Sequence, residues 1–182
     1  LMINTNGLRI ARDRDFCKRL SQYMPGIEIY LQFDSFEEKA LRELRGADLR
    51  KVREQAIAHL NEFKISTTLV STVKKGLNDH EIGKIIEYAL QQKCVRGVSF
   101  QPIQAAGRLE NFDPKRDRYT LTEVRRAILE QSPYFQPKDL LPVPCHPDCL
   151  AMAYALKVNG QVMPLTGLLD PTAFLNAMPN SV

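Results

Sequence analysis

The sequence predicts an α/β protein with parallel strands, and a repeated strand-then-helix pattern supports this prediction. Apolar or β-branched segments begin near residues 27, 65 and 95, and helical patterns occur between and after them. Strands separated by helices are parallel neighbours joined by right-handed crossovers. A (β/α) barrel and an open doubly wound sheet both fit this pattern, and both bind ligands at the carboxyl ends of their strands.

The first complete unit begins with an alternating segment. Apolar residues alternate with more polar ones over residues 27–33, which predicts a short strand with one apolar face. Ser35 and Glu38 then form a capping-box pattern that predicts the start of a helix. Helical periodicity continues to residue 62, with a predicted break at residues 45–48.

Two further units follow the same order. Residues 65–73 are rich in β-branched side chains and predict a buried strand, and residues 95–101 predict the next one. Capping-box patterns at residues 78–81 and 120–123 predict the helices that follow, the second of which ends near Gln131.

After residue 132 the pattern changes. Several prolines keep the chain extended or turning, and residues 151–165 predict a β-hairpin around the turn Asn159–Gly160. We therefore divide the chain into an α/β part at residues 1–131 and a C-terminal extension at residues 132–182.

Composition and length favour an ordinary globular protein. The chain has 182 residues, of which 44% are hydrophobic and 25% charged, and its net charge is +4. No apolar run approaches the roughly 18 residues of a membrane helix, so we expect a cytoplasmic protein that does not span a membrane. Scattered basic residues argue against a nucleic-acid partner. Because residues 1–7 look like the end of a buried strand and a turn, we expect an N-terminal portion to precede them.

Polar residues at the predicted strand ends are the candidate ligand-binding residues. If the strand over residues 27–33 stays regular, Gln32 and Asp34 share one of its faces, which favours a ligand role. Asp34 could also simply precede a helix, where a carboxylate suits the amide dipoles. The candidates are Thr5, Asn6, Gln32, Asp34, Ser71, Thr72, Ser99 and Gln101.

The cysteines suggest a metal site more than a disulfide framework. Their positions are 17, 94, 145 and 149, which are too few and too uneven for a disulfide-stapled domain, so a reducing compartment fits. Cys145 and Cys149 are spaced such that a turn can bring both thiols to one metal. Inert loop thiols and a structural zinc are the alternatives. The sequence contains no P-loop and no dinucleotide-binding glycine motif.

Several segments, taken in order, resemble the later strands of radical S-adenosylmethionine enzymes. They are Thr5-Asn6-Gly7, Tyr30 to Ser35, Gly76 to Ile82 and Gly97 to Pro102. The resemblance covers about residues 3–104. It is strongest to the branch that includes tetraether-lipid synthases and pterin-methylating proteins, where a segment like Pro144–Cys149 follows the barrel.

The resemblance implies a partial TIM-like (β/α) barrel that lacks its N-terminal strands. A 4Fe-4S cluster would reductively cleave S-adenosyl-L-methionine to a 5′-deoxyadenosyl radical for C–H activation, leading to methylation or C–C bond formation. The cluster motif C-x3-C-x2-C is absent from this chain. We expect it upstream of Leu1, so we expect the chain alone to be inactive.

The resemblance also implies roles for particular residues and partners. The candidates at the strand ends would hold S-adenosylmethionine, with Gln32 and Asp34 near its carboxylate or ribose. Cys145 and Cys149 would be ligands of an auxiliary iron-sulfur cluster. The partners would be a small-molecule or lipid substrate and an electron donor such as ferredoxin or flavodoxin. The alternative is a non-catalytic α/β module that binds a ligand or a partner.

Overall fold

A computed structural model describes residues 1–104, 112–143, 149–170 and 172–173. The chain divides into two compact units, Leu1–Tyr119 and Thr120–Val182, and each is considered by itself. Within the described residues, no helix is long and apolar enough to cross a lipid bilayer.

The first unit contains a parallel sheet of four strands. In chain order these are β1 (Met2–Thr5), β2 (Glu28–Gln32), β3 (Thr67–Val73) and β4 (Val95–Pro102), and their order in the sheet is the same. A doubly wound sheet reverses direction at its switch point, whereas these strands advance one place at each step. The α/β class is confirmed, and this order is that of consecutive units in a (β/α) barrel.

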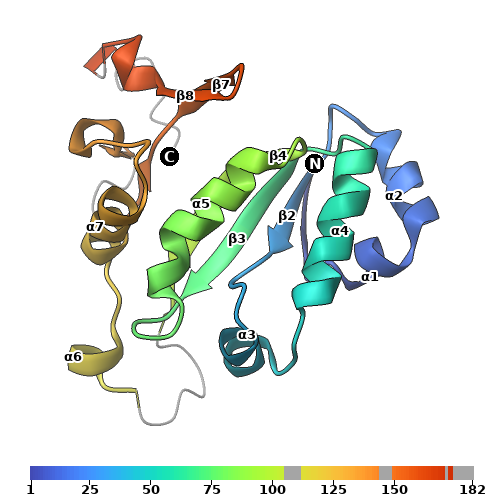
Figure 1. Cartoon of the computed structure of the whole chain (residues 1–182), viewed down its shortest axis with the longest axis horizontal. Coiled ribbons are helices and arrows are strands. Elements are labelled where there is room, and N and C mark those ends of the chain that lie inside the picture. The colour runs from blue at the N-terminus through green and yellow to red at the C-terminus, as the bar shows by residue number, and fades with distance from the viewer. Residues whose placement is uncertain (105–111, 144–148, 171, 174–182) are drawn as a thin grey trace. The chain divides into compact units, whose positions relative to one another are not determined.

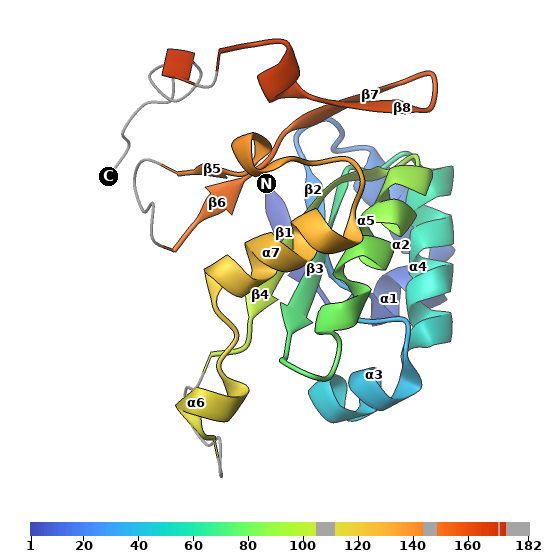
Figure 2. The ribbon, with the colours of Figure 1, turned by 60° about the vertical axis from the view of Figure 1, so that its left-hand side comes forward.

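Two short helices follow β1, two follow β2 and one follows β3. They are α1 (Leu8–Arg12), α2 (Arg14–Ser21), α3 (Glu38–Arg45), α4 (Arg50–Glu62) and α5 (Ile82–Gln91). The helices α1, α2, α4 and α5 lie on one face of the sheet, and α3 lies beyond the carboxyl end of β2, as Figures 1 and 2 show. The short helix α6 (Pro114–Asp117) comes later in this unit.

The hydrophobic core lies between the sheet and these helices. Ile29 and Leu31 of β2 and Leu69 of β3 are fully buried, and Leu60 of α4 packs in the same cluster. Ile27 and Phe33 are buried as well. The apolar face predicted for residues 27–33 is therefore confirmed, as is the buried strand at 67–73.

Two of the three predicted capping boxes are wrong. The helix α3 begins at Glu38 with no side-chain cap, because the Ser35 hydroxyl donates instead to the carboxylate of Glu81. A 3-10 turn over Asp79–Glu81 precedes α5, and the Asn78 side chain binds backbone groups of β3 and its flanking loops. In both places a tertiary partner outcompeted the local cap.

The second unit contains one longer helix and two small antiparallel pairs. The helix α7 (Leu121–Gln131) starts with the predicted capping box of Thr120 and Glu123, which is confirmed. Strands β7 (Ala155–Val158) and β8 (Gln161–Pro164) form the predicted hairpin, whose turn residues Asn159 and Gly160 both have positive φ. Ala151 and Met152, predicted to belong to this hairpin, instead form β6, which pairs with β5 (Leu141–Pro142).

Candidate functional site

The face of the sheet opposite the helices is predominantly polar. Because side chains alternate along a strand, the residues between the buried ones point to this face. Strand register aligns Gln32 with Val70 and Ser99, and Thr72 with Gln101. We call this surface the polar face; its hydrogen-bonding members are Asn4, Glu28, Tyr30, Gln32, Thr68, Thr72, Ser99 and Gln101.

Four of the candidate ligand-binding residues come together at the carboxyl end of the polar face. Gln32 and Ser99 lie in one register row, and Thr72 and Gln101 lie in the next. The amide nitrogen of Gln101 lies 3.5 Å from the hydroxyl of Ser99. The Thr72 hydroxyl already accepts from Nη2 of Arg45 at 2.9 Å, and the four side chains together offer donors and acceptors of the kind that suits a polar ligand.

Three other candidates serve the backbone in this structure. Thr5 and Asn6 shape the turn into α1, since their side-chain oxygens accept from the amides of Gly7 at 3.1 Å and Leu8 at 3.2 Å. The buried Ser71 hydroxyl donates to the carbonyl of Asp34 at 2.9 Å. Ligand binding by all of these residues stays a prediction.

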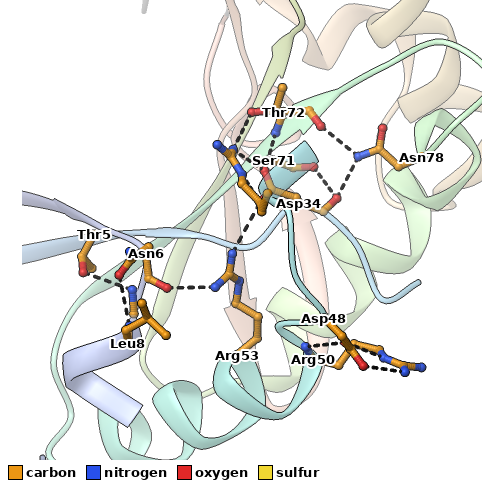
Figure 3. A network of polar contacts seen from close by, with 12 residues as sticks. Thr5, Asn6, Leu8, Asp34, Asp48, Arg50, Arg53, Ser71, Thr72 and Asn78 are labelled. Atoms are coloured by element: carbon orange, nitrogen blue, oxygen red, sulfur yellow. Dashed lines mark hydrogen bonds and ion pairs between the residues drawn. The ribbon is translucent and has the colours of Figure 1, made fainter. Parts of the chain in front are cut away.

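Asp34 lies at the centre of a buried ionic network (Figure 3). Its carboxylate accepts from Nε of Arg45 at 2.9 Å, from Nη2 of Arg45 at 2.7 Å and from the amide of Thr72 at 3.1 Å. The expected regular continuation of β2 is wrong, because the strand ends at Gln32 and Asp34 has φ 63°. That backbone turn places Asp34, with no exposed surface, among its partners.

Arg53, on the first turns of α4, is the residue that sequence reasoning missed. Its side chain is 3% exposed, and its Nη2 lies 3.6 Å from the Asp34 carboxylate. Nη1 donates to the carbonyl of Asn6 at 2.8 Å. Nε and Nη2 are buried without a hydrogen-bond acceptor. Burial lowers the pKa of Arg53, and the Asp34 carboxylate partly offsets this effect.

The charges in this network do not cancel. Two guanidinium groups, of Arg45 and Arg53, surround the single carboxylate of Asp34. Buried polar groups are nearly always hydrogen-bonded, so a buried guanidinium with two unused nitrogens is an exception that requires a reason. An anionic ligand group at this end of the sheet would supply the missing acceptor and charge.

The loops around the network are held by further buried hydrogen bonds. The Asn78 side chain donates to the carbonyls of Asp34 at 2.9 Å and of Thr72 at 2.8 Å. Glu81 accepts from the amide of Phe36 at 3.1 Å as well as from the Ser35 hydroxyl. These contacts tie the segment after β2 to the loop after β3, so the unusual backbone of Asp34 is fixed from several sides.

The described residues provide no metal centre of three or more His, Cys, Asp or Glu ligands. Cys17 and Cys94 are buried, and Cys149 is exposed. Cys145 lies outside the described residues. An auxiliary cluster on Cys145 and Cys149 therefore stays a prediction.

Thiol alkylation of the complete protein, prepared without iron, separates these cysteines. At pH 8 we expect iodoacetamide to modify Cys149 first, because its side chain is exposed. Burial raises the pKa of Cys94 to about 11 and also raises that of Cys17, so both should react only after unfolding in urea. Peptide mass spectrometry measures the order in which the cysteines are alkylated. Equal labelling of Cys94 and Cys149 in the folded protein would contradict the expectation.

Comparison with known proteins adds one distant relative. The chain is 27% identical over 208 aligned positions to 7,8-dihydro-6-hydroxymethylpterin dimethyltransferase of Methanocaldococcus jannaschii. The alignment covers 100% of this chain but 40% of the relative, so the chain spans about two-fifths of that enzyme's length. No family model matches the chain. The chain is thus a distant homologue of part of a pterin dimethyltransferase.

Proposed function

We propose that this chain is the segment of a radical S-adenosylmethionine methyltransferase that holds S-adenosylmethionine at the carboxyl ends of its barrel strands. The observation that carries the proposal is the excess of positive charge at the part-exposed Arg45 and the buried Arg53, where Nη2 of Arg45 also donates to the hydroxyl of Thr72 on the polar face at 2.9 Å. The distant homology to a pterin dimethyltransferase and the resemblance of the strand-end motifs support it.

The residues present fit S-adenosylmethionine. Its methionine carboxylate can pair with the part-exposed guanidinium of Arg45, and it would reach the two unused nitrogens of Arg53 if the side chains that bury Arg53 move aside. The amides of Gln32 and Gln101 and the hydroxyl of Ser99 can hydrogen-bond its ribose hydroxyls or its ammonium group. When bound, S-adenosylmethionine and a 4Fe-4S cluster supply the one-electron chemistry that activates a C–H bond.

The contribution of this chain is binding and orientation. The ionic network and its loop contacts keep the rim of the sheet rigid, so a bound ligand is held in one geometry. The cluster ligands would come from outside these 182 residues, which contain no C-x3-C-x2-C motif. By analogy with the name of the relative, we propose methylation as the reaction and a pterin as the substrate.

Binding and turnover in the complete protein test this proposal. After anaerobic iron and sulfide reconstitution, it should bind S-adenosylmethionine and form 5′-deoxyadenosine with dithionite. Neutral hydrogen bonds contribute about 0.5–1.5 kcal/mol each. The double variant Gln32→Ala, Gln101→Ala should therefore raise the Kd for S-adenosylmethionine by about five- to 150-fold. Gln91→Ala, on the exposed end of α5, is the matched control. A wild-type protein that binds no S-adenosylmethionine would refute the proposal.

A further inference from the structure

Glu28 is the one carboxylate among the described strand residues on the polar face. Its neighbours Ile27 and Ile29 are buried in the core, so the side chain of Glu28 points away from the helices. It is half-buried, and its Oε1 accepts from the Thr68 hydroxyl of β3 at 2.7 Å. Within the described part of the chain, no basic side chain pairs with it.

The surroundings of Glu28 leave its carboxylate able to accept more hydrogen bonds. An ionised carboxylate offers about four acceptor sites, and Thr68 uses one of them. Gly97 lies opposite Thr68 on β4, where an added Cβ would come within 3.2 Å of the Thr68 hydroxyl oxygen. The absence of a side chain there leaves the hydroxyl room to face Glu28. Tyr30 is the next residue of β2 on this face.

A purely structural role does not account for a charge at this position. A glutamine would accept the same hydrogen bond from Thr68 without the cost of partly burying an ionised group. The charge would be explained by a ligand with two adjacent N–H groups, because carboxylates bind such donor pairs with two parallel hydrogen bonds. A ring carrying an amino group next to a ring N–H has this arrangement.

We propose that Glu28 is a specificity-determining residue that recognises the amino-pyrimidinone edge of a pterin-class substrate. This inference rests on the proposed function and adds the place of the substrate. Glu28 is the first residue of β2 and Gln32 is the last. The substrate would therefore lie nearer the amino ends of the strands than the cofactor held at their carboxyl ends. Tyr30 lies between Glu28 and Gln32 on the same face of β2.

Equilibrium titration of the complete protein with fluorescent 6-hydroxymethylpterin tests the inference. The analogue 6-hydroxymethyllumazine, in which oxygen replaces the amino group, lacks one of the two donors. The wild-type protein should bind the pterin at least tenfold more tightly than the lumazine, because a site built for a donor rejects a ligand that lacks it. Glu28→Gln should weaken pterin binding at least tenfold and remove most of this discrimination.

Matched variants separate recognition from folding. Glu54→Gln makes the same exchange at an exposed position of α4 and should leave both affinities unchanged. Thr68→Val removes the hydroxyl that orients Glu28 and should weaken pterin binding by about two- to fivefold. The affinity for S-adenosylmethionine reports on the carboxyl end of the sheet and shows whether the Glu28→Gln protein is folded.

The outcomes distinguish this inference from the proposed function. A wild-type protein that binds S-adenosylmethionine but does not prefer the pterin would overturn the inference alone. Retained discrimination in the folded Glu28→Gln protein would do the same. Absence of S-adenosylmethionine binding and of 5′-deoxyadenosine in the wild type would refute the proposed function, whatever the pterin affinity.

Discussion

Asp34→Ala should lower the free energy of unfolding by about 3–5 kcal/mol, which is typical when one partner of a buried ionic network is removed. The substitution leaves the guanidinium of Arg53, whose side chain is 3% exposed, without a counter-charge. It also removes the acceptors of two hydrogen bonds from Arg45 and one from the Thr72 amide. Urea unfolding followed by circular dichroism of the complete protein measures the loss.

A matched surface pair provides the control for this prediction. Asp48 also accepts from Nε and Nη2 of an arginine, Arg50, at 2.9 and 2.8 Å, but this pair is open to solvent. The Arg50 hydrogen bonds lower the pKa of Asp48 to about 2. Solvent screens such pairs, so Asp48→Ala should shift the unfolding midpoint far less than Asp34→Ala. Equal shifts in the unfolding midpoint would show that burial does not determine how much the Asp34 network contributes to stability.

The strands of the first unit could be predicted because their signals are local. The alternation over residues 27–33 and the β-branched residues over 65–73 are patterns that mark which side chains face the core. The structure buries the apolar side chains of both segments in the core. The parallel arrangement then brought the polar strand ends to one edge. This arrangement aligns the candidates Gln32, Ser99, Thr72 and Gln101, whose role in ligand binding stays a prediction.

The ionic network could not be predicted, because its members are joined only by the tertiary fold. Arg45 and Arg53 follow Asp34 by 11 and 19 residues, and the backbone turn at Asp34 with φ 63° has no clear local signal. One signal was available: Arg53 lies on the apolar stripe of α4 that also contains Ala56, Ile57 and Leu60. A charged residue on a buried stripe is a candidate functional residue, since burying it costs stability.

Arg53→Met should separate stability from ligand binding. Asp34 keeps both hydrogen bonds from Arg45 in this variant, so its charge remains paired. The variant loses the hydrogen bond from Nη1 to the Asn6 carbonyl, but an apolar side chain of similar length also removes the cost of burying two nitrogens without acceptors. We therefore expect the free energy of unfolding to stay within about 1 kcal/mol of wild type. Binding of S-adenosylmethionine should nevertheless weaken about 10- to 100-fold, because hydrogen bonds to a charged group contribute about 1.5–3 kcal/mol.

The control for Arg53→Met is Arg50→Met on the same helix, where the arginine forms exposed pairs with Asp48 and Glu38. It should change neither stability nor S-adenosylmethionine affinity appreciably. Isothermal titration gives the affinities, and urea unfolding gives the stabilities. If Arg53→Met unfolds like Asp34→Ala, the guanidinium is a structural counter-charge for Asp34. If it stays folded and binds poorly, the guanidinium of Arg53 serves ligand binding and the fold does not need it, as expected of a functional residue that breaks a local rule of folding.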